Sequence, residues 1–117
     1  MKTIDLSLVE QYNRDLTYGN VIYDYMRGNL IHLEEDINRF TKRGYSQFQL
    51  KKFTDLHAVC ISIQDKVTYH KPLDEHEMKA FEDINRYNTA KNTEMKRLAI
   101  FTAIVAVFGV IVSIFFK

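Results

Sequence analysis

Residues 98–116 read LAIFTAIVAVFGVIVSIFF and contain no charged side chain. A helix of this length spans about 28 Å, close to the hydrocarbon core of a bilayer at about 30 Å. Thirteen of the nineteen residues are Leu, Ile, Val or Phe, and together they favour insertion by roughly 4 to 8 kcal/mol. The sequence therefore predicts a helical domain over 1–90, a basic segment over 91–97 and a single transmembrane helix over 98–116.

The flanking sequence indicates how this span sits in the membrane. In a soluble core, such a helix would need apolar partners all around it, which the preceding, mostly polar residues do not supply. The first residues lack the charged lead, apolar run and cleavage site of a signal peptide, so we expect post-translational insertion, as in tail-anchored proteins. Basic residues precede the span and only Lys117 follows it. This pattern predicts a cytoplasmic N-terminal domain and a C-terminus on the far side.

Composition excludes some classes of function. Residues 1–97 carry fifteen Lys or Arg and fifteen Asp or Glu, so this part has no net charge that would attract nucleic acid. The single cysteine, Cys60, allows no internal disulfide and fits a reducing compartment. The frequent Ile, Lys, Asn, Tyr and Phe are typical of AT-rich genomes, including those of many bacteriophages. About ninety residues make one domain with a thin core, which a partner or a second copy would help to stabilise.

Apolar residues recur at steps of three and four over residues 9–40, which predicts a helix. Asp5 or Ser7 can cap its start, and basic residues followed by a glycine mark its end. Gly19 interrupts the pattern, so a kink or break is expected near residues 18–20. The predicted buried seam consists of Val9, Tyr12, Leu16, Tyr23, Met26, Leu30, Leu33, Ile37 and Phe40.

A second helix is predicted to start after a cap at Ser46. Its apolar positions are Phe53, Leu56, Cys60, Ile63 and Val67. The alternative is a β-hairpin within 58–70, because residues 58–63 also alternate at period two and are β-branched. Helix is favoured, since an isolated hairpin is only marginally stable.

Pro72 separates a third predicted helix, which Asp74 can cap and which has Glu75 and Glu77 in its first turn. Its predicted buried side holds Met78, Phe81, Ile84 and Tyr87. The polar residues 85–93 form either a flexible stalk or a helix that runs directly into the membrane. The expected fold is therefore an all-α bundle or helical hairpin of about three helices, followed by one transmembrane helix.

No residue pattern indicates catalysis, so we expect neither an enzyme nor a bound cofactor or metal. His57-x-x-Cys60 followed by His70 and His76 provides four potential zinc ligands, but their spacing matches no familiar zinc pattern. Cys60 also lies on a predicted apolar seam, where a lone cysteine acts as a small hydrophobe. Phosphate-binding glycine loops and hydrolase signatures are absent.

Three sets of residues can instead mediate binding. Tyr18 and Tyr25 are aromatic side chains that can anchor a protein partner. Lys91, Lys96 and Arg97 set the orientation of the span and can attract anionic lipid.

The third set is a face of small residues within the span. Its members follow steps of four, three and four, which lets two helix backbones approach in lipid. They are Thr102, Ala106, Gly109 and Ser113. This face predicts self-association of the chain.

Two functions fit these features. The first is a protein-interaction or regulatory module that the span holds at the cytoplasmic face of a membrane, where tethering raises its effective concentration. The second is a small membrane-active protein, holin-like or toxin-like or an antagonist of one, which works through oligomerisation of its span. An uncharged span lines a water-filled pore poorly, which favours the first.

Overall fold

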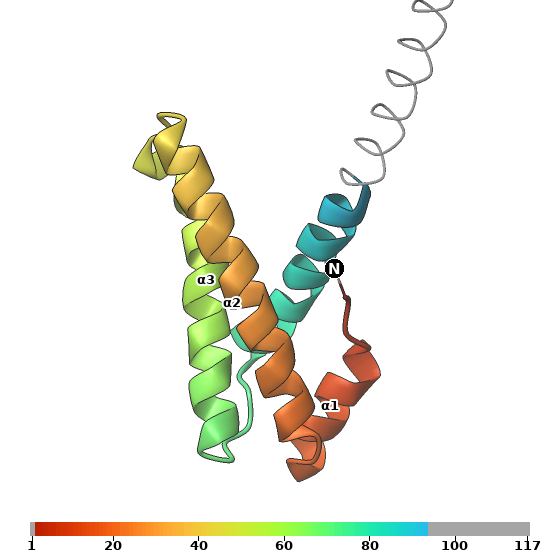
Figure 1. Cartoon of the computed structure of the whole chain (residues 1–117). Coiled ribbons are helices and arrows are strands. Elements are labelled where there is room, and N and C mark those ends of the chain that lie inside the picture. Colours follow the sequence, from red (N-terminus) through yellow and green to blue (C-terminus); the bar gives the residue numbers. More distant parts are fainter. Residues whose placement is uncertain (1, 94–117) are drawn as a thin grey trace, which may run out of the picture.

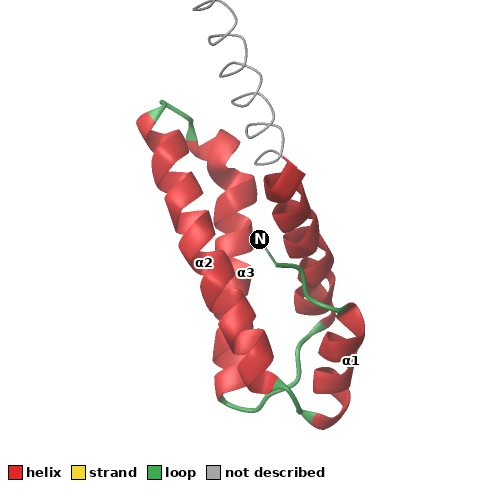
Figure 2. Ribbon diagram, turned by 45° about the vertical axis from the view of Figure 1, so that its right-hand side comes forward, coloured by secondary structure: helices red, strands yellow, loops and turns green. Residues whose placement is uncertain are grey.

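The computed structural model describes residues 2–93, which form an all-helical bundle (Figure 1). Its helices are α1 (Leu6–Asp15), α2 (Gly19–Lys42), α3 (Gln47–Thr68) and a helix over 75–93 that reaches the end of the described range. No strand occurs among these residues. Figure 2 shows α2 and α3 as a long antiparallel hairpin, with α1 and the 75–93 helix on one side of it. The prediction of an all-α domain is confirmed.

The predicted span over 98–116 lies outside the described residues, as do Lys96 and Arg97. The same is true of its small-residue face: Thr102, Ala106, Gly109 and Ser113. Within residues 2–93, no helix is both long and apolar enough to cross a membrane. The contacts below therefore concern only the domain that precedes the apolar run.

The helix predicted over 9–40 is broken into α1 and α2. Leu16 and Tyr18 adopt left-handed backbone angles, with φ of 61° and 64°. The Asp15 carboxylate accepts hydrogen bonds from the backbone N–H and the hydroxyl of Thr17. Such local bonds compete with continuation of a helix, so the break falls just before the position that the glycine indicated.

The break changes which face of α2 is buried. A Cβ at Gly19 would lie 3.2 Å from Cγ1 of Val67, so α2 begins in close contact with the end of α3. The buried residues of α2 are Ile22, Met26, Asn29, Leu33 and Asp36. Leu16 and Tyr23 lie on the predicted seam but are 38% and 37% exposed. That part of the seam is wrong, because the residues between the helices rotate α2 relative to α1.

The turn between α2 and α3 forms as predicted. Gly44 has a φ of 87°, which a residue without Cβ adopts at little cost. Ser46 caps α3 in a capping box, because its hydroxyl accepts from the Gln49 N–H while the Gln49 side chain accepts from the Ser46 N–H. The rings of Phe40 and Tyr45 stack across the turn with centroids 4.8 Å apart.

One apolar core joins the four helices. α3 contributes its predicted residues Leu56, Cys60, Ile63 and Val67, all of them buried. Residues 58–68 are helical, which excludes the alternative of a hairpin over 58–70. The 75–93 helix adds Phe81 and Ile84.

The polar residues 85–93 continue this last helix and pack on the domain. Asn85 donates to the Ile4 carbonyl at 2.9 Å and accepts from the Ile4 N–H at 3.0 Å. Asn88 is buried and donates to the side chain of Asn29 on α2 at 2.9 Å. These amides tie the chain's first residues and α2 to the helix, so this segment is not a flexible stalk.

Gly28→Ala is expected to stabilise the domain by about 1 kcal/mol. Gly28 lies inside α2, and a Cβ there would meet nothing within 4 Å. Urea unfolding of the full chain in lipid nanodiscs, followed by circular dichroism, measures the effect. Gly19→Ala is the matched control and should destabilise, because its Cβ would crowd Val67. A loss of stability in Gly28→Ala would contradict the expectation.

Candidate functional site

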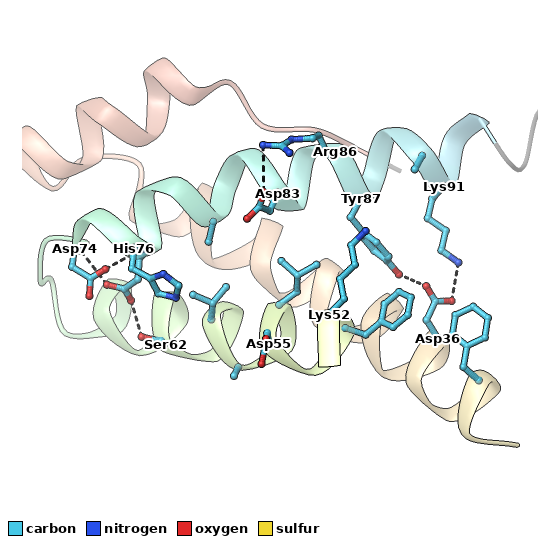
Figure 3. Close-up of a pocket in the computed structure, with 18 residues that line it drawn as sticks. Asp36, Lys52, Asp55, Ser62, Asp74, His76, Asp83, Arg86, Tyr87 and Lys91 are labelled. Carbon is cyan, nitrogen blue, oxygen red and sulfur yellow. Dashed lines mark hydrogen bonds and ion pairs between the residues drawn. The ribbon is translucent and has the colours of Figure 1, made fainter. Parts of the chain in front are cut away.

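A groove of about 1080 Å³ lies between α3 and the 75–93 helix (Figure 3). Its apolar lining comes from Phe53, Leu56 and Val59 of α3 and from Ala80 and Tyr87 of the facing helix. Charged or polar side chains of both helices surround this lining: Lys52, Asp55, His76, Asp83 and Arg86. Grooves with this distribution bind the apolar face of an amphipathic helix.

Side-chain size explains why the groove stays open. Ala58, Ala80 and Ala90 line it, and their methyl groups are too small to fill the space between two helices. Larger groups join the two walls near both ends. At one end, for example, the Tyr87 ring meets the Phe53 ring edge-on, with centroids 6.2 Å apart.

Asp36 of α2 holds this end of the groove together (Figure 3). Its carboxylate is bound by Lys91 at 2.8 Å, by Arg39 at 2.6 Å and by the Tyr87 hydroxyl. Burial alone would raise the pKa of Asp36, but the hydrogen bonds from Lys91 and Tyr87 and the charges of Lys91 and Arg39 outweigh it and lower that pKa. The ionised carboxylate therefore fixes the last turns of the 75–93 helix against α2.

Glu77 closes the other end, although its side chain is only 2% exposed. It accepts from the Ser62 hydroxyl at 2.7 Å and pairs with Lys66 of α3. It also forms a capping box with Asp74, which begins the helix as predicted. The hydrogen bond to Glu77 raises the pKa of Lys66, and the Glu77 N–H lowers the pKa of Asp74.

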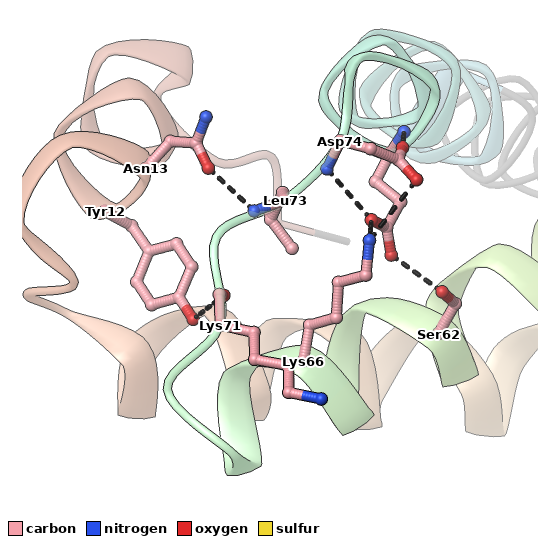
Figure 4. Close-up of polar contacts among 8 residues, drawn as sticks. Tyr12, Asn13, Ser62, Lys66, Lys71, Leu73 and Asp74 are labelled. Carbon is pink, nitrogen blue, oxygen red and sulfur yellow. Dashed lines mark hydrogen bonds and ion pairs between the residues drawn. The ribbon is translucent and has the colours of Figure 1, made fainter.

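The loop that leads into the 75–93 helix is held by α1 (Figure 4). The Asn13 side chain accepts from the Leu73 N–H at 2.7 Å, and the Tyr12 hydroxyl donates to the Lys71 carbonyl at 2.8 Å. Burial raises the pKa of Tyr12, and the charge of Glu77 adds to this, so the hydroxyl remains a donor. The start of the 75–93 helix is therefore also positioned by contacts outside the apolar lining of the groove.

The two tyrosines predicted to anchor a partner lie in different environments. Tyr18 is 48% exposed at the start of α2. Tyr25 is half-buried, and its hydroxyl donates to Asn85 at 2.7 Å and accepts from Asn88 at 2.9 Å. Burial raises the pKa of Tyr25. Neither tyrosine lines the groove, and the Tyr25 hydroxyl is occupied within the domain.

Lys91 was predicted to set topology or to face lipid. The structure pairs it with Asp36 and leaves 19% of its side chain exposed. Sequence reasoning missed this pair and the groove. The position of Asp36, three residues after Leu33 on a buried helical face, was a sign that it is buried. A charged residue at such a position is nevertheless expected to be exposed to solvent unless its partner is known.

The four potential zinc ligands do not come together. Cys60 is fully buried, His57 contacts Glu34 at 3.0 Å, and His76 lines the groove. Among residues 2–93, no group of three or more His, Cys, Asp or Glu could hold a metal ion. Burial raises the pKa of the Cys60 thiol to about 12, so it is protonated at neutral pH and is not a nucleophile.

Neither a family model nor a curated protein nor a solved structure matches this chain. The class that the described residues define is an all-helical domain with an open groove between two of its helices.

Proposed function

We propose that the chain is a single-pass membrane protein whose helical domain binds a protein partner at the cytoplasmic membrane surface. The observation that carries this proposal is the groove between α3 and the 75–93 helix. Its apolar lining would take the apolar face of an amphipathic helix, and its charged border would fix the helix orientation. The domain would recruit, inhibit or scaffold that partner.

The amino-acid sequence supports the membrane half of the proposal. Residues 98–116 are long and apolar enough to span a bilayer, and only residues 94–97 separate them from the helix that forms one wall of the groove. A partner bound in the groove would therefore be held close to the bilayer. Tethering of this kind raises the effective concentration of the domain without new contacts.

Photo-crosslinking tests the groove directly. A photoreactive residue at Ala58, which is exposed and lines the groove, is expected to give a discrete adduct when the full chain is irradiated in its native membrane. Asp55→Arg should abolish the adduct by placing a long cation in the groove. Asp65→Arg is the matched control, because it makes the same charge change at an exposed position of α3 that does not line the groove.

A variant of the same experiment tests whether the domain or the span carries the function. Replacing 98–116 by an unrelated apolar helix of equal length should leave the adduct unchanged. Loss of the adduct in that variant, with the domain still folded, would assign the function to the span, as in a holin-like or toxin-like protein. The absence of any adduct from Ala58 would contradict the use of the groove.

A further inference from the structure

The turn between α2 and α3 carries a concentrated positive charge. Residues 39–52 contain five Lys or Arg and no Asp or Glu. The rest of the described range 2–93 contains eight Lys or Arg and fourteen Asp or Glu. The net charge of the domain is thus near zero because a basic end, residues 39–52, offsets the acidic remainder. We call residues 39–52 the basic tip.

Four of the five charges of the basic tip have no acidic partner within the described residues. The exception is Arg39, which forms an ion pair within α2. Lys42 and Arg43 complement the negative end of the α2 dipole. Lys51 and Lys52 lie one turn after the start of α3, where the helix dipole gives a cation no stabilisation. Helix stability therefore does not explain these two lysines.

The basic tip also exposes aromatic surface. Phe48 is 87% exposed and Tyr45 is 40% exposed. Phe40 stacks on Tyr45, and the guanidinium of Arg43 lies 5.8 Å from the Phe40 ring centroid. Exposed aromatic rings among unpaired cations are typical of segments that lie at the interface of an anionic membrane.

The basic tip lies on the side of the domain from which the chain continues toward its apolar run. Figures 1 and 2 both show the α2–α3 turn and the C-terminal end of the 75–93 helix at the same end of the bundle. The pair between Lys91 and Asp36 lies near the end of α2 that enters the turn. Leu98 follows Thr93 by five residues, so the run begins at most about 18 Å from Thr93. A membrane that contains the apolar run 98–116 would therefore lie close to the basic tip.

We propose that the basic tip is a second membrane contact, which binds the headgroups of anionic lipids. This inference rests on the proposed membrane location of the domain. Lys42, Arg43, Lys51 and Lys52 would be attracted to the negative surface potential of the leaflet, and Phe48 would enter the headgroup region. Nucleic acid presents similar phosphates, but the position of the tip beside the exit toward the apolar run favours lipid. Two contacts would stop the domain from tumbling on its tether.

The chain contains no tryptophan, so the fluorescence of a single introduced tryptophan reports on this contact. The full chain with Phe48→Trp is reconstituted into phosphatidylcholine vesicles with and without phosphatidylglycerol. Its emission is expected to shift to shorter wavelength, and to be quenched by brominated acyl chains, only with phosphatidylglycerol present. High salt should reverse both effects. The matched control is Tyr69→Trp, at a 71% exposed position beyond the opposite end of α3, whose emission should not change.

Charge variants give the second measurement. Lys51→Gln combined with Lys52→Gln in the reporter chain should weaken docking by about fivefold per charge removed. Lys71→Gln combined with Lys79→Gln removes the same charge from exposed positions outside the basic tip and should leave docking unchanged. Equal effects of the two pairs would overturn a specific role for the tip.

The remaining outcomes separate this inference from the proposed function. If the chain floats with vesicles but the reporters at positions 48 and 69 behave alike, the contact at the tip is overturned and the membrane location stands. If the full chain does not float with vesicles, both fail. A reporter at position 48 that responds to a DNA or RNA oligonucleotide and not to anionic vesicles would overturn the lipid contact in favour of nucleic acid.

Discussion

Replacing Phe81 by alanine is expected to lower the free energy of unfolding of the domain by about 4 kcal/mol. Phe81 is fully buried in the core and is among its largest side chains. Truncation would lose the transfer free energy of the ring and leave a cavity between helices that relax only partly. Because small domains have total stabilities of about 5 to 15 kcal/mol, the variant would lose a large part of the stability of the domain.

The effect is measured by urea unfolding of the full chain in nanodiscs of phosphatidylcholine alone, which offer no anionic lipid to Phe48, followed by near-ultraviolet circular dichroism of the tyrosines. Phe48→Ala is the matched control, since it removes the same atoms from a side chain that is 87% exposed. That change should stay within about 0.5 kcal/mol. Similar losses in both variants would contradict the burial of Phe81 and the exposure of Phe48.

Asp36→Asn is expected to cost about 2 kcal/mol at neutral pH. The Asp36 side chain is 6% exposed and binds Lys91, Arg39 and Tyr87. Without its charge, Lys91 loses its counter-ion in a site where only 19% of its side chain is exposed. If the two residues act as a pair, Lys91→Met should cost much less in the Asp36→Asn background than in the wild-type chain.

The cost of Asp36→Asn should also depend on pH. The pKa of Asp36 is lowered below its ordinary value of 3.8, because its hydrogen bonds and neighbouring charges outweigh the effect of burial. The unfolded chain therefore takes up this proton first as the pH falls. The advantage of the wild-type chain should be constant above about pH 5 and vanish as the pH falls through the lowered pKa of the folded state.

The control for this titration is Asp24→Asn, which breaks the pair of Asp24 with Arg27. Both side chains are about two-thirds exposed and their charged groups are 3.6 Å apart, so the change should be too small to measure. A difference between wild type and Asp36→Asn that persists unchanged at acid pH would show that the carboxylate charge is not what stabilises this end of the groove.

The starts of α1, α3 and the 75–93 helix could be read from the sequence because their caps are local. Asp5, Ser46 and Asp74 each bond to a backbone N–H two or three residues further along. Gly44 ends the turn after α2 with a positive φ. Each of these features depends on side-chain chemistry within one turn of helix, which neighbouring residues display directly.

Buried polar residues could not be read in this way. Asp36, Glu77 and Asn88 are almost inaccessible to solvent, yet their residue types are normally exposed. Their burial depends on partners that are distant in sequence. Lys91 lies 55 residues from Asp36, Ser62 lies 15 residues from Glu77, and Asn29 lies 59 residues from Asn88. A periodic apolar pattern contains no information about such pairs.

The amino-acid sequence alone determined the helical class, the caps at Asp5, Ser46 and Asp74, and the separation of a polar domain from an apolar run, because short-range propensity and composition control these features. Only the tertiary structure decided which face of α2 is buried, since the left-handed residues Leu16 and Tyr18 reset the helical phase. It also decided where the groove and the basic tip lie. Both arise from how helices distant in sequence pack, with long side chains joining them at the ends and alanines leaving the space between them open.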